Sequence, residues 1–169
     1  THEDSDKGGF TKKGAGKLIL EGDLTHEAPL DADAITSKTT VSVGTLQIGD
    51  GGSTGSIASE NIVVESGALL RTNITESITI DGAISGDGSL EKTGSGKLTL
   101  SGNNSYDGGT AIHNGELVVA SSDAVGNGDI TLGSSDGSTS GALSLARGLR
   151  LTNNIDFGAG GGSIGMANI

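Results

Sequence analysis

The sequence lacks cysteine and tryptophan, and it contains one proline, two phenylalanines and one tyrosine among its 169 residues. Without cysteine the chain forms neither a disulfide nor a thiolate metal site. The single proline, Pro29, leaves backbone N–H donors for hydrogen-bonded ladders almost throughout. Compact domains rely on aromatic rings for much of their buried area. We therefore expect a thin interior of Leu, Ile and Val inside a long, narrow body.

The chain also lacks an excess of basic residues, and its formal net charge is −11. Binding to nucleic acid requires clustered Lys and Arg, so we expect no nucleic-acid partner. No apolar run approaches the ~20 residues of a membrane helix. The opening residues 1–6 are polar and acidic, unlike a signal peptide. We expect any export signal to lie outside this sequence.

Apolar residues recur at alternate positions, separated by glycine-rich clusters that also contain Asp or Asn. A period of two predicts short, half-buried strands, and Gly with Asp or Asn is typical of tight turns. We expect strands of three to five residues and no helix of normal length. The alternating pairs are Leu18 with Leu20, Leu46 with Ile48, Ile78 with Ile80, Leu98 with Leu100, Leu117 with Val119, Ile130 with Leu132, and Leu143 with Leu145.

One phrase occurs twice. Residues 12–22 return as residues 92–102, at an offset of 80 and with 7 of 11 positions identical. A shorter echo of residues 44–48 at residues 115–119 has an offset of 71. The first copy therefore holds about nine extra residues, and we predict an irregular loop over Asp23–Thr40. We expect a single segment over 1–169, with a degenerate first repeat unit at 8–85 and a second unit at 86–169.

Such repetition favours a right-handed parallel β-helix, a solenoid of roughly seven to eight rungs. In each rung the leucines of the phrase would stack inward, and its lysines would be solvated. A β-sandwich or barrel is the alternative, because Asp-Gly turns also connect hairpins. Neither of those folds explains an internal echo at 80 residues or so small a supply of aromatic rings.

The second copy carries a longer pattern. Residues 86–102 read Gly-Asp-Gly-Ser-Leu-Glu-Lys-Thr-Gly-Ser-Gly-Lys-Leu-Thr-Leu-Ser-Gly, followed by Asn103, Tyr106, residues 108–110 (Gly-Gly-Thr) and residues 115–119 (Gly-Glu-Leu-Val-Val). This pattern resembles the passenger-associated β-strand repeat of bacterial autotransporters, whereas the first copy departs from it after Gly22. The resemblance implies a β-helical passenger of a Gram-negative bacterium, exported across the outer membrane to the cell surface and joined to a C-terminal outer-membrane barrel.

Other motifs point to chemistry only weakly. Gly160–Gly165 satisfies G-x-G-x-x-G without a helix to follow, and Ser95–Leu98 lacks the flanking residues of a phosphate loop. His2, His26 and His113 have no metal-ligand spacing, and no Gly-x-Ser-x-Gly elbow accompanies them. We therefore expect no catalytic residue, no cofactor, no metal and no small-molecule substrate.

The leading hypothesis is a non-catalytic passenger segment, a stalk or adhesin that also aids translocation and folding. Its partner would be a host-cell or matrix receptor, or another copy of itself, contacted by loops such as Asp23–Thr40 and Gly133–Gly141. The alternatives are a polysaccharide-acting enzyme that uses Asp81 or Asp87, and a self-associating module. The pair Asn103–Asn104 is expected to hold a turn or to form a side-chain ladder between rungs.

Overall fold

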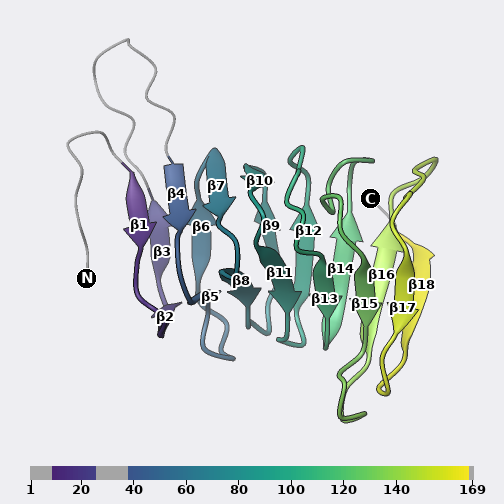
Figure 1. Cartoon of the computed structure of the whole chain (residues 1–169). Helices are drawn as coiled ribbons and strands as arrows, with labels where there is room; N and C mark the ends of the chain where they lie inside the picture. Colours follow the sequence, from purple (N-terminus) through teal and green to yellow (C-terminus); the bar gives the residue numbers. More distant parts are fainter. Residues whose placement is uncertain (1–8, 26–37, 168–169) are drawn as a thin grey trace.

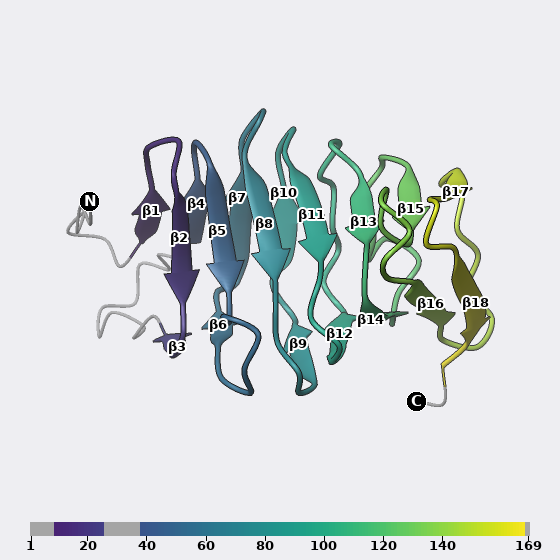
Figure 2. The ribbon, with the colours of Figure 1, turned by 90° about the horizontal axis from the view of Figure 1, so that it is seen from below.

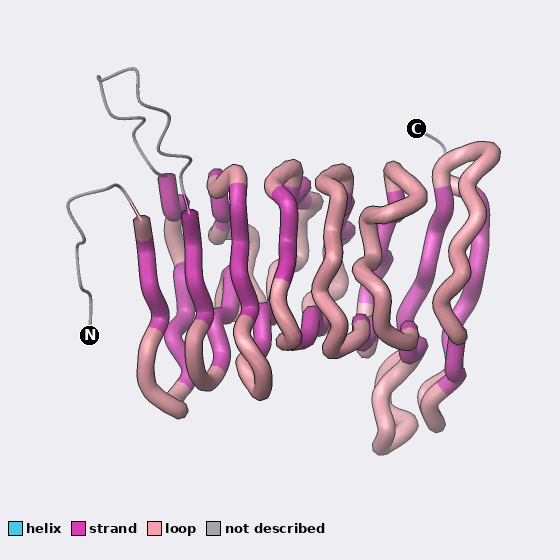
Figure 3. Tube along the Cα trace, turned by 45° about the horizontal axis from the view of Figure 1, so that its top comes forward, coloured by secondary structure: helices cyan, strands magenta, loops and turns pink. Residues whose placement is uncertain are grey.

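The computed structural model describes residues 9–25 and 38–167, and in these residues the chain forms strands and turns but no helix (Figure 3). The strands are three to five residues long, as the spacing of the apolar pairs predicts. Within the described ranges, accordingly, no helix could cross a bilayer.

The strands form three larger sheets and one small one. The four-stranded sheet contains β1 (Phe10–Lys12), β4 (Lys38–Val41), β7 (Asn61–Val64) and β10 (Ala83–Ser85). The seven-stranded sheet contains β2 (Lys17–Leu20), β5 (Thr45–Ile48), β8 (Leu69–Thr72), β11 (Ser89–Lys92), β13 (Thr110–Ile112), β15 (Ile130–Leu132) and β17 (Ile155–Phe157). The five-stranded sheet contains β9 (Ile78–Ile80), β12 (Lys97–Leu100), β14 (Gly115–Val119), β16 (Gly141–Leu145) and β18 (Gly162–Met166). The small sheet pairs β3 (Asp23–Thr25) with β6 (Ser56–Ala58).

Successive strands belong to different sheets, and the strands of neighbouring coils pair in parallel (Figures 1 and 2). Thus β1, β2 and β3 form one coil, and β4, β5 and β6 lie beside them in the next. This arrangement is a β-solenoid, which confirms the predicted parallel fold. The seven strands of the longest sheet bound about six turns, slightly fewer than the seven to eight rungs expected from the repeat length.

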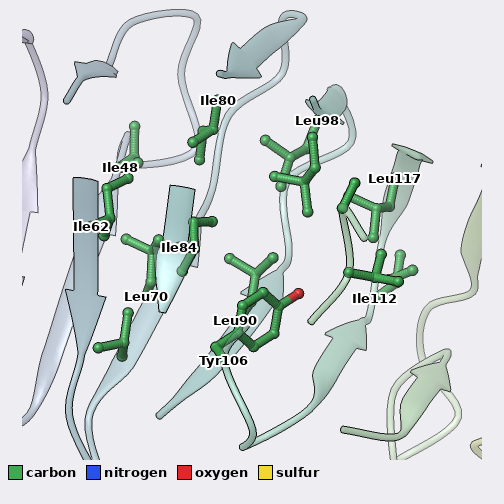
Figure 4. Close-up of a cluster of buried hydrophobic side chains, with 14 of the residues drawn as sticks. Ile48, Ile62, Leu70, Ile80, Ile84, Leu90, Leu98, Tyr106, Ile112 and Leu117 are labelled. Carbon is green, nitrogen blue, oxygen red and sulfur yellow. The ribbon is translucent and has the colours of Figure 1, made fainter. Parts of the chain in front are cut away.

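Rows of apolar side chains fill the interior (Figure 4). In the seven-stranded sheet Leu46, Leu70 and Leu90 are register partners, and all three are buried. In the five-stranded sheet Leu98 and Leu117 form a similar row. Because every coil presents its side chains at the same register, each coil buries the apolar row of its neighbour.

Apolar side chains in the first and last coils are more exposed. Leu18 of β2 is 37% exposed and Met166 of β18 is 64% exposed, although their register partners within the stack are buried or partly buried. These strands stand at the edges of their sheets, with a neighbour on one side only in the described residues. Their position in the stack, and not their residue type, explains the exposure.

After β10, irregular backbone and side chains continue the face of the four-stranded sheet. The Asn104 side-chain oxygen accepts a hydrogen bond from the Ile84 N–H (2.7 Å), and its amide nitrogen donates to the Ala124 carbonyl (2.5 Å). Asn104 is buried and joins three coils through backbone groups, whereas Asn103 is exposed, so the expected contact between rungs is made by Asn104 alone and not by a ladder of stacked side chains. Nearby, the Tyr106 hydroxyl lies 2.6 Å from the Thr110 hydroxyl inside the solenoid.

The two loops singled out in the sequence differ in outcome. Residues 23–40 are not one irregular loop, because their two ends form β3 and the first part of β4, where backbone pairing with neighbouring coils extends the stack. Residues 26–37 between them lie outside the described residues. Residues 133–140 do form a turn, closed by a hydrogen bond from the Ser134 N–H to the Thr139 carbonyl (2.9 Å).

Candidate functional site

The doubled phrase forms a strand, a turn and a second strand in both copies. The first copy runs from β1 to β2, and the second from β11 to β12. The two copies occupy different corners of the solenoid: the first joins the four-stranded to the seven-stranded sheet, and the second joins the seven-stranded to the five-stranded sheet. The second phrase begins ten strands after the first. Because each of the intervening coils has three strands, ten strands make three full coils plus one strand, and the second phrase therefore begins in the next sheet around the solenoid.

One lysine of each phrase is buried, which corrects the expectation that the lysines of the phrase are solvated. Lys12 is 5% exposed and Lys92 is 0% exposed. The cause is the strand period: Phe10 and Leu90 point inward, so the residues two positions later point inward as well. By contrast, the side chain of Lys97 in the second phrase is 43% exposed.

The buried ammonium of Lys92 contacts two turns in neighbouring coils. Its Nζ donates to the Gly94 carbonyl in its own turn, and to the Asn114 carbonyl in the turn between β13 and β14 (3.2 Å). Because β13 and β14 belong to the following coil, this single side chain bridges one coil to the next.

Lys12 makes the equivalent contacts in the first copy. Its Nζ donates to the Gly14 carbonyl in its own turn and to the Val43 carbonyl in the turn between β4 and β5 (2.7 Å). A further contact reaches the Lys13 carbonyl (3.4 Å). We call each buried lysine, together with the two turns that it joins, a lysine clip.

The receiving turn of each clip contains a glycine in the left-handed region, Gly44 (φ +76°) or Gly115 (φ +73°). A Cβ atom at Gly44 would lie 2.5 Å from the carbonyl oxygen of Gly16, and one at Gly115 would overlap the carbonyl oxygen of Gly96. Both the backbone angle and the close approach of two turns therefore require glycine here.

The Lys92 side chain is fully buried, and its register partner in the following coil is the apolar Ile112. Burial lowers the pKa of Lys92 from 10.5 to about 8, since removal from water penalises the charged form. Thr72 is its register partner in β8, and the Thr72 hydroxyl is buried without a hydrogen-bond partner.

Charged side chains tie the same coils together on the outer surface. Glu91 forms an ion pair with Arg71 of the preceding coil (2.8 Å), and its other carboxylate oxygen lies 3.3 Å from Nδ1 of His113 in the following coil. Lys97 lies 3.4 Å from Glu116. Such partly exposed pairs contribute only about 0–1 kcal/mol each.

The two carboxylates proposed for catalysis do not meet. Asp81 follows β9 and Asp87 precedes β11, so the strand β10 separates them. Asp81 accepts a hydrogen bond from the Ser101 hydroxyl and lines a hollow of about 580 Å³ together with Glu60, whereas Asp87 does not line it. Sequence reasoning missed Glu60 because only the stacking of coils brings it to the same hollow as Asp81.

The remaining sequence candidates have ordinary structural roles. Gly160–Gly165 runs from a turn into β18, and Ser95–Leu98 is a turn entering β12. His113 pairs with Glu91, while His2 and His26 lie outside the described residues. Over 9–25 and 38–167, no group of three or more His, Cys, Asp or Glu side chains could hold a metal ion.

A scan against protein-family models matches the passenger-associated-transport-repeat family twice, at residues 10–48 and 90–119. Each match contains one complete lysine clip, and each ends with the strand that follows the receiving turn, β5 or β14. Searches of the curated proteins and of the solved structures returned no match. Two repeats and a parallel solenoid lead to one conclusion: this chain carries two passenger-associated transport repeats and is a segment of an autotransporter passenger.

Proposed function

We propose that this segment is a non-catalytic stalk of the passenger and that the stacking of its coils assists translocation and folding. The observation that supports this role is the seven-stranded parallel sheet, which runs without interruption through both repeats. Each completed coil leaves an open edge of backbone donors and acceptors on which the next coil pairs.

Stacking also releases free energy step by step. Burying a Leu side chain such as Leu98 or Leu117 is worth about 1.5–3 kcal/mol relative to leaving it in water. When coils fold outside the outer membrane, this free energy opposes backward movement of the chain. The segment would thereby help to draw the remaining passenger outward.

The family implies a C-terminal translocator barrel in the same precursor and export to the cell surface. We propose that 1–169 is a single passenger segment with repeat units at 8–85 and 86–169. Residues 23–40 and 133–141 are the proposed contacts for a host-cell or matrix receptor, or for a second copy. In the second of these, hydrogen bonds from Ser134 and Ser138 lower the pKa of the Asp136 carboxyl to about 2.

Charge substitutions on opposite faces of β12 test the stalk role in the full precursor. Leu98→Asp places a carboxylate in the interior, whereas Thr99→Asp places the same charge on the outer face of the same strand. Surface display is measured by the susceptibility of the passenger to protease added to intact cells. We expect several-fold less display for Leu98→Asp and unchanged display for Thr99→Asp. Equal display of the two variants would refute an export role for coil stacking.

The hollow beside Glu60 and Asp81 supplies the test of the catalytic alternative. The purified chain is assayed against a panel of polysaccharides, together with the variants Glu60→Gln and Asp81→Asn. Inertness of all three proteins agrees with a stalk. Glycan cleavage that either variant abolishes would show an enzyme instead. Light scattering over a range of concentrations separates a monomeric stalk from a self-associating module.

A further inference from the structure

The two lysine clips make the same pair of contacts, one to the lysine's own turn and one to a turn of the following coil, although they lie in different parts of the solenoid. They lie at different corners of the solenoid, between different pairs of sheets. Lys12 reaches an acceptor 31 residues later in the chain, and Lys92 reaches one 22 residues later. Nine additional residues in the connection therefore leave the contact intact, and in both copies the acceptor belongs to the following coil.

We propose that the buried lysine makes each repeat a two-coil unit, in which the corner that carries the lysine and the corner that receives it become ordered together. The matched family segments agree with this unit, because each spans both corners. The proposal concerns the isolated chain and holds or fails separately from the export role.

The physical basis is the cost of dehydrating an ammonium group. A buried charge is costly unless hydrogen bonds satisfy it, and a lysine ammonium has three donors. Its own turn supplies the Gly94 carbonyl to Lys92, and the next coil supplies the Asn114 carbonyl. Until that coil is in place, the ammonium would lie at an open edge in contact with water.

The lysine clip also depends on the glycine of the receiving turn. A Cβ atom at Gly115 would lie 2.7 Å from Lys92 Nζ, as well as close to the carbonyls of the lysine turn. Only glycine lets the receiving turn come near enough to accept the ammonium. The lysine and the glycine of the following coil therefore form one structural element, although they are far apart in the repeat.

Hydrogen exchange on the full chain tests this coupling. The variant Lys92→Met keeps an unbranched apolar stem and removes the three donors. Lys97→Met is the matched control: it removes a second lysine of the same phrase, whose side chain is 43% exposed and whose contact with Glu116 is a surface ion pair worth only about 0–1 kcal/mol. For Lys92→Met we expect exchange to accelerate at least ten-fold in both turns of the clip, residues 93–96 and 113–116, with no change at 42–45.

Lys12→Met should produce the mirror result: faster exchange at 13–16 and 42–45, and unchanged exchange at 113–116. Faster exchange in the lysine's own turn alone would show a local cap and overturn the two-coil unit. Unchanged exchange, or an equal effect of Lys97→Met, would overturn it as well.

Lysine acylation of the unmodified chain provides a second measurement in case the variants fail to fold. Mass spectrometry would locate the modified amines at increasing urea concentrations. We expect Lys97 to react in the native protein, and Lys92 to react only in the urea range where residues 113–116 lose protection. Native-state labelling of Lys92 at the rate of Lys97 would contradict the proposal.

Discussion

Thr72 and Lys92 are register partners in the neighbouring strands β8 and β11, and both side chains are fully buried. They interrupt an otherwise apolar row in which Ile48 precedes them and Ile112 follows. The Lys92 ammonium finds acceptors at the edge of the interior, whereas the Thr72 hydroxyl has no hydrogen-bond partner. This row of the interior is therefore polar at two adjacent strands, β8 and β11, and the second of them opens the second repeat.

Replacing Thr72 by Val should stabilise the chain. The substitution keeps the branched shape and removes a buried hydroxyl whose missing hydrogen bond costs on the order of 1 kcal/mol. Urea denaturation followed by circular dichroism measures the change. Thr79→Val, on the exposed side of β9, is the control and should have little effect. Destabilisation by Thr72→Val would mean that the hydroxyl binds the Lys92 ammonium in solution.

The stability of the chain should rise with pH because of Lys92. In the unfolded state the amine keeps its proton up to its ordinary pKa of 10.5, whereas in the folded state burial lowers the pKa to about 8. Between these values the unfolded state binds more protons, so raising the pH favours the folded state. The expected gain reaches about 3 kcal/mol across the full window, at 1.36 kcal/mol per pKa unit.

The Lys92→Met variant is the reference for this measurement, because it retains every other titratable group near the clip. Those groups include Glu91 on the same strand, His113 and Glu116 in the following coil, and Lys97 in the second strand of the phrase. The difference between the two pH profiles of unfolding free energy isolates Lys92. A flat difference from pH 7 to about 10.5 would contradict a buried, proton-releasing amine.

Equivalent glycines of the two phrases should respond in opposite directions to alanine. A Cβ atom at Gly96 would overlap the Glu76 carbonyl of the preceding coil, whereas one at Gly16 meets no described atom within 4 Å. We expect Gly96→Ala to destabilise the chain by about 2 kcal/mol or more. Gly16→Ala should stabilise it by about 0.4–1 kcal/mol, because alanine restricts the unfolded chain. Thermal unfolding measures both, and equal effects would show that the neighbouring coil is not so close.

Asn104 should be far more sensitive than its neighbour Asn103. Asn104→Ala removes two hydrogen bonds and leaves the buried Ile84 N–H and Ala124 carbonyl without partners, at a cost of about 2–3 kcal/mol. Asn103 is exposed, so Asn103→Ala should change stability by less than about 0.5 kcal/mol. Chemical denaturation distinguishes the two, and similar losses for both variants would exclude a stabilising bridge between coils at Asn104.

Much of the fold could be predicted from local pattern. The pairs Leu46 with Ile48 and Leu98 with Leu100 are buried strand positions, as their spacing indicated. The alternation of strand residues also predicts the burial of Lys92, because the buried Leu90 lies two residues before it on the same strand. Because lysine side chains are usually solvated, we expected Lys92 to lie at the surface. Only the carbonyls of Gly94 and Asn114, one of them from another coil, make the burial of this charge possible.

The number of turns and the placement of the repeat were harder to predict. Both depend on how many residues each corner uses, and the corners here differ in length. Residues 133–140 form a long turn, whereas two residues, His113 and Asn114, connect β13 to β14. An offset of 80 residues consequently does not return the phrase to the same face.

The amino-acid sequence was sufficient for the short strands and the glycine-rich turns, because these follow from residues close together in the chain, and its internal repetition was sufficient for the parallel solenoid and the passenger repeat. Only the folded chain shows which face each copy occupies, that Glu60 and Asp81 line one hollow, and which carbonyls of the following coil accept from the buried Lys12 and Lys92. Those features depend on contacts between coils. Such contacts join residues about 20 or more positions apart, and no local period encodes them.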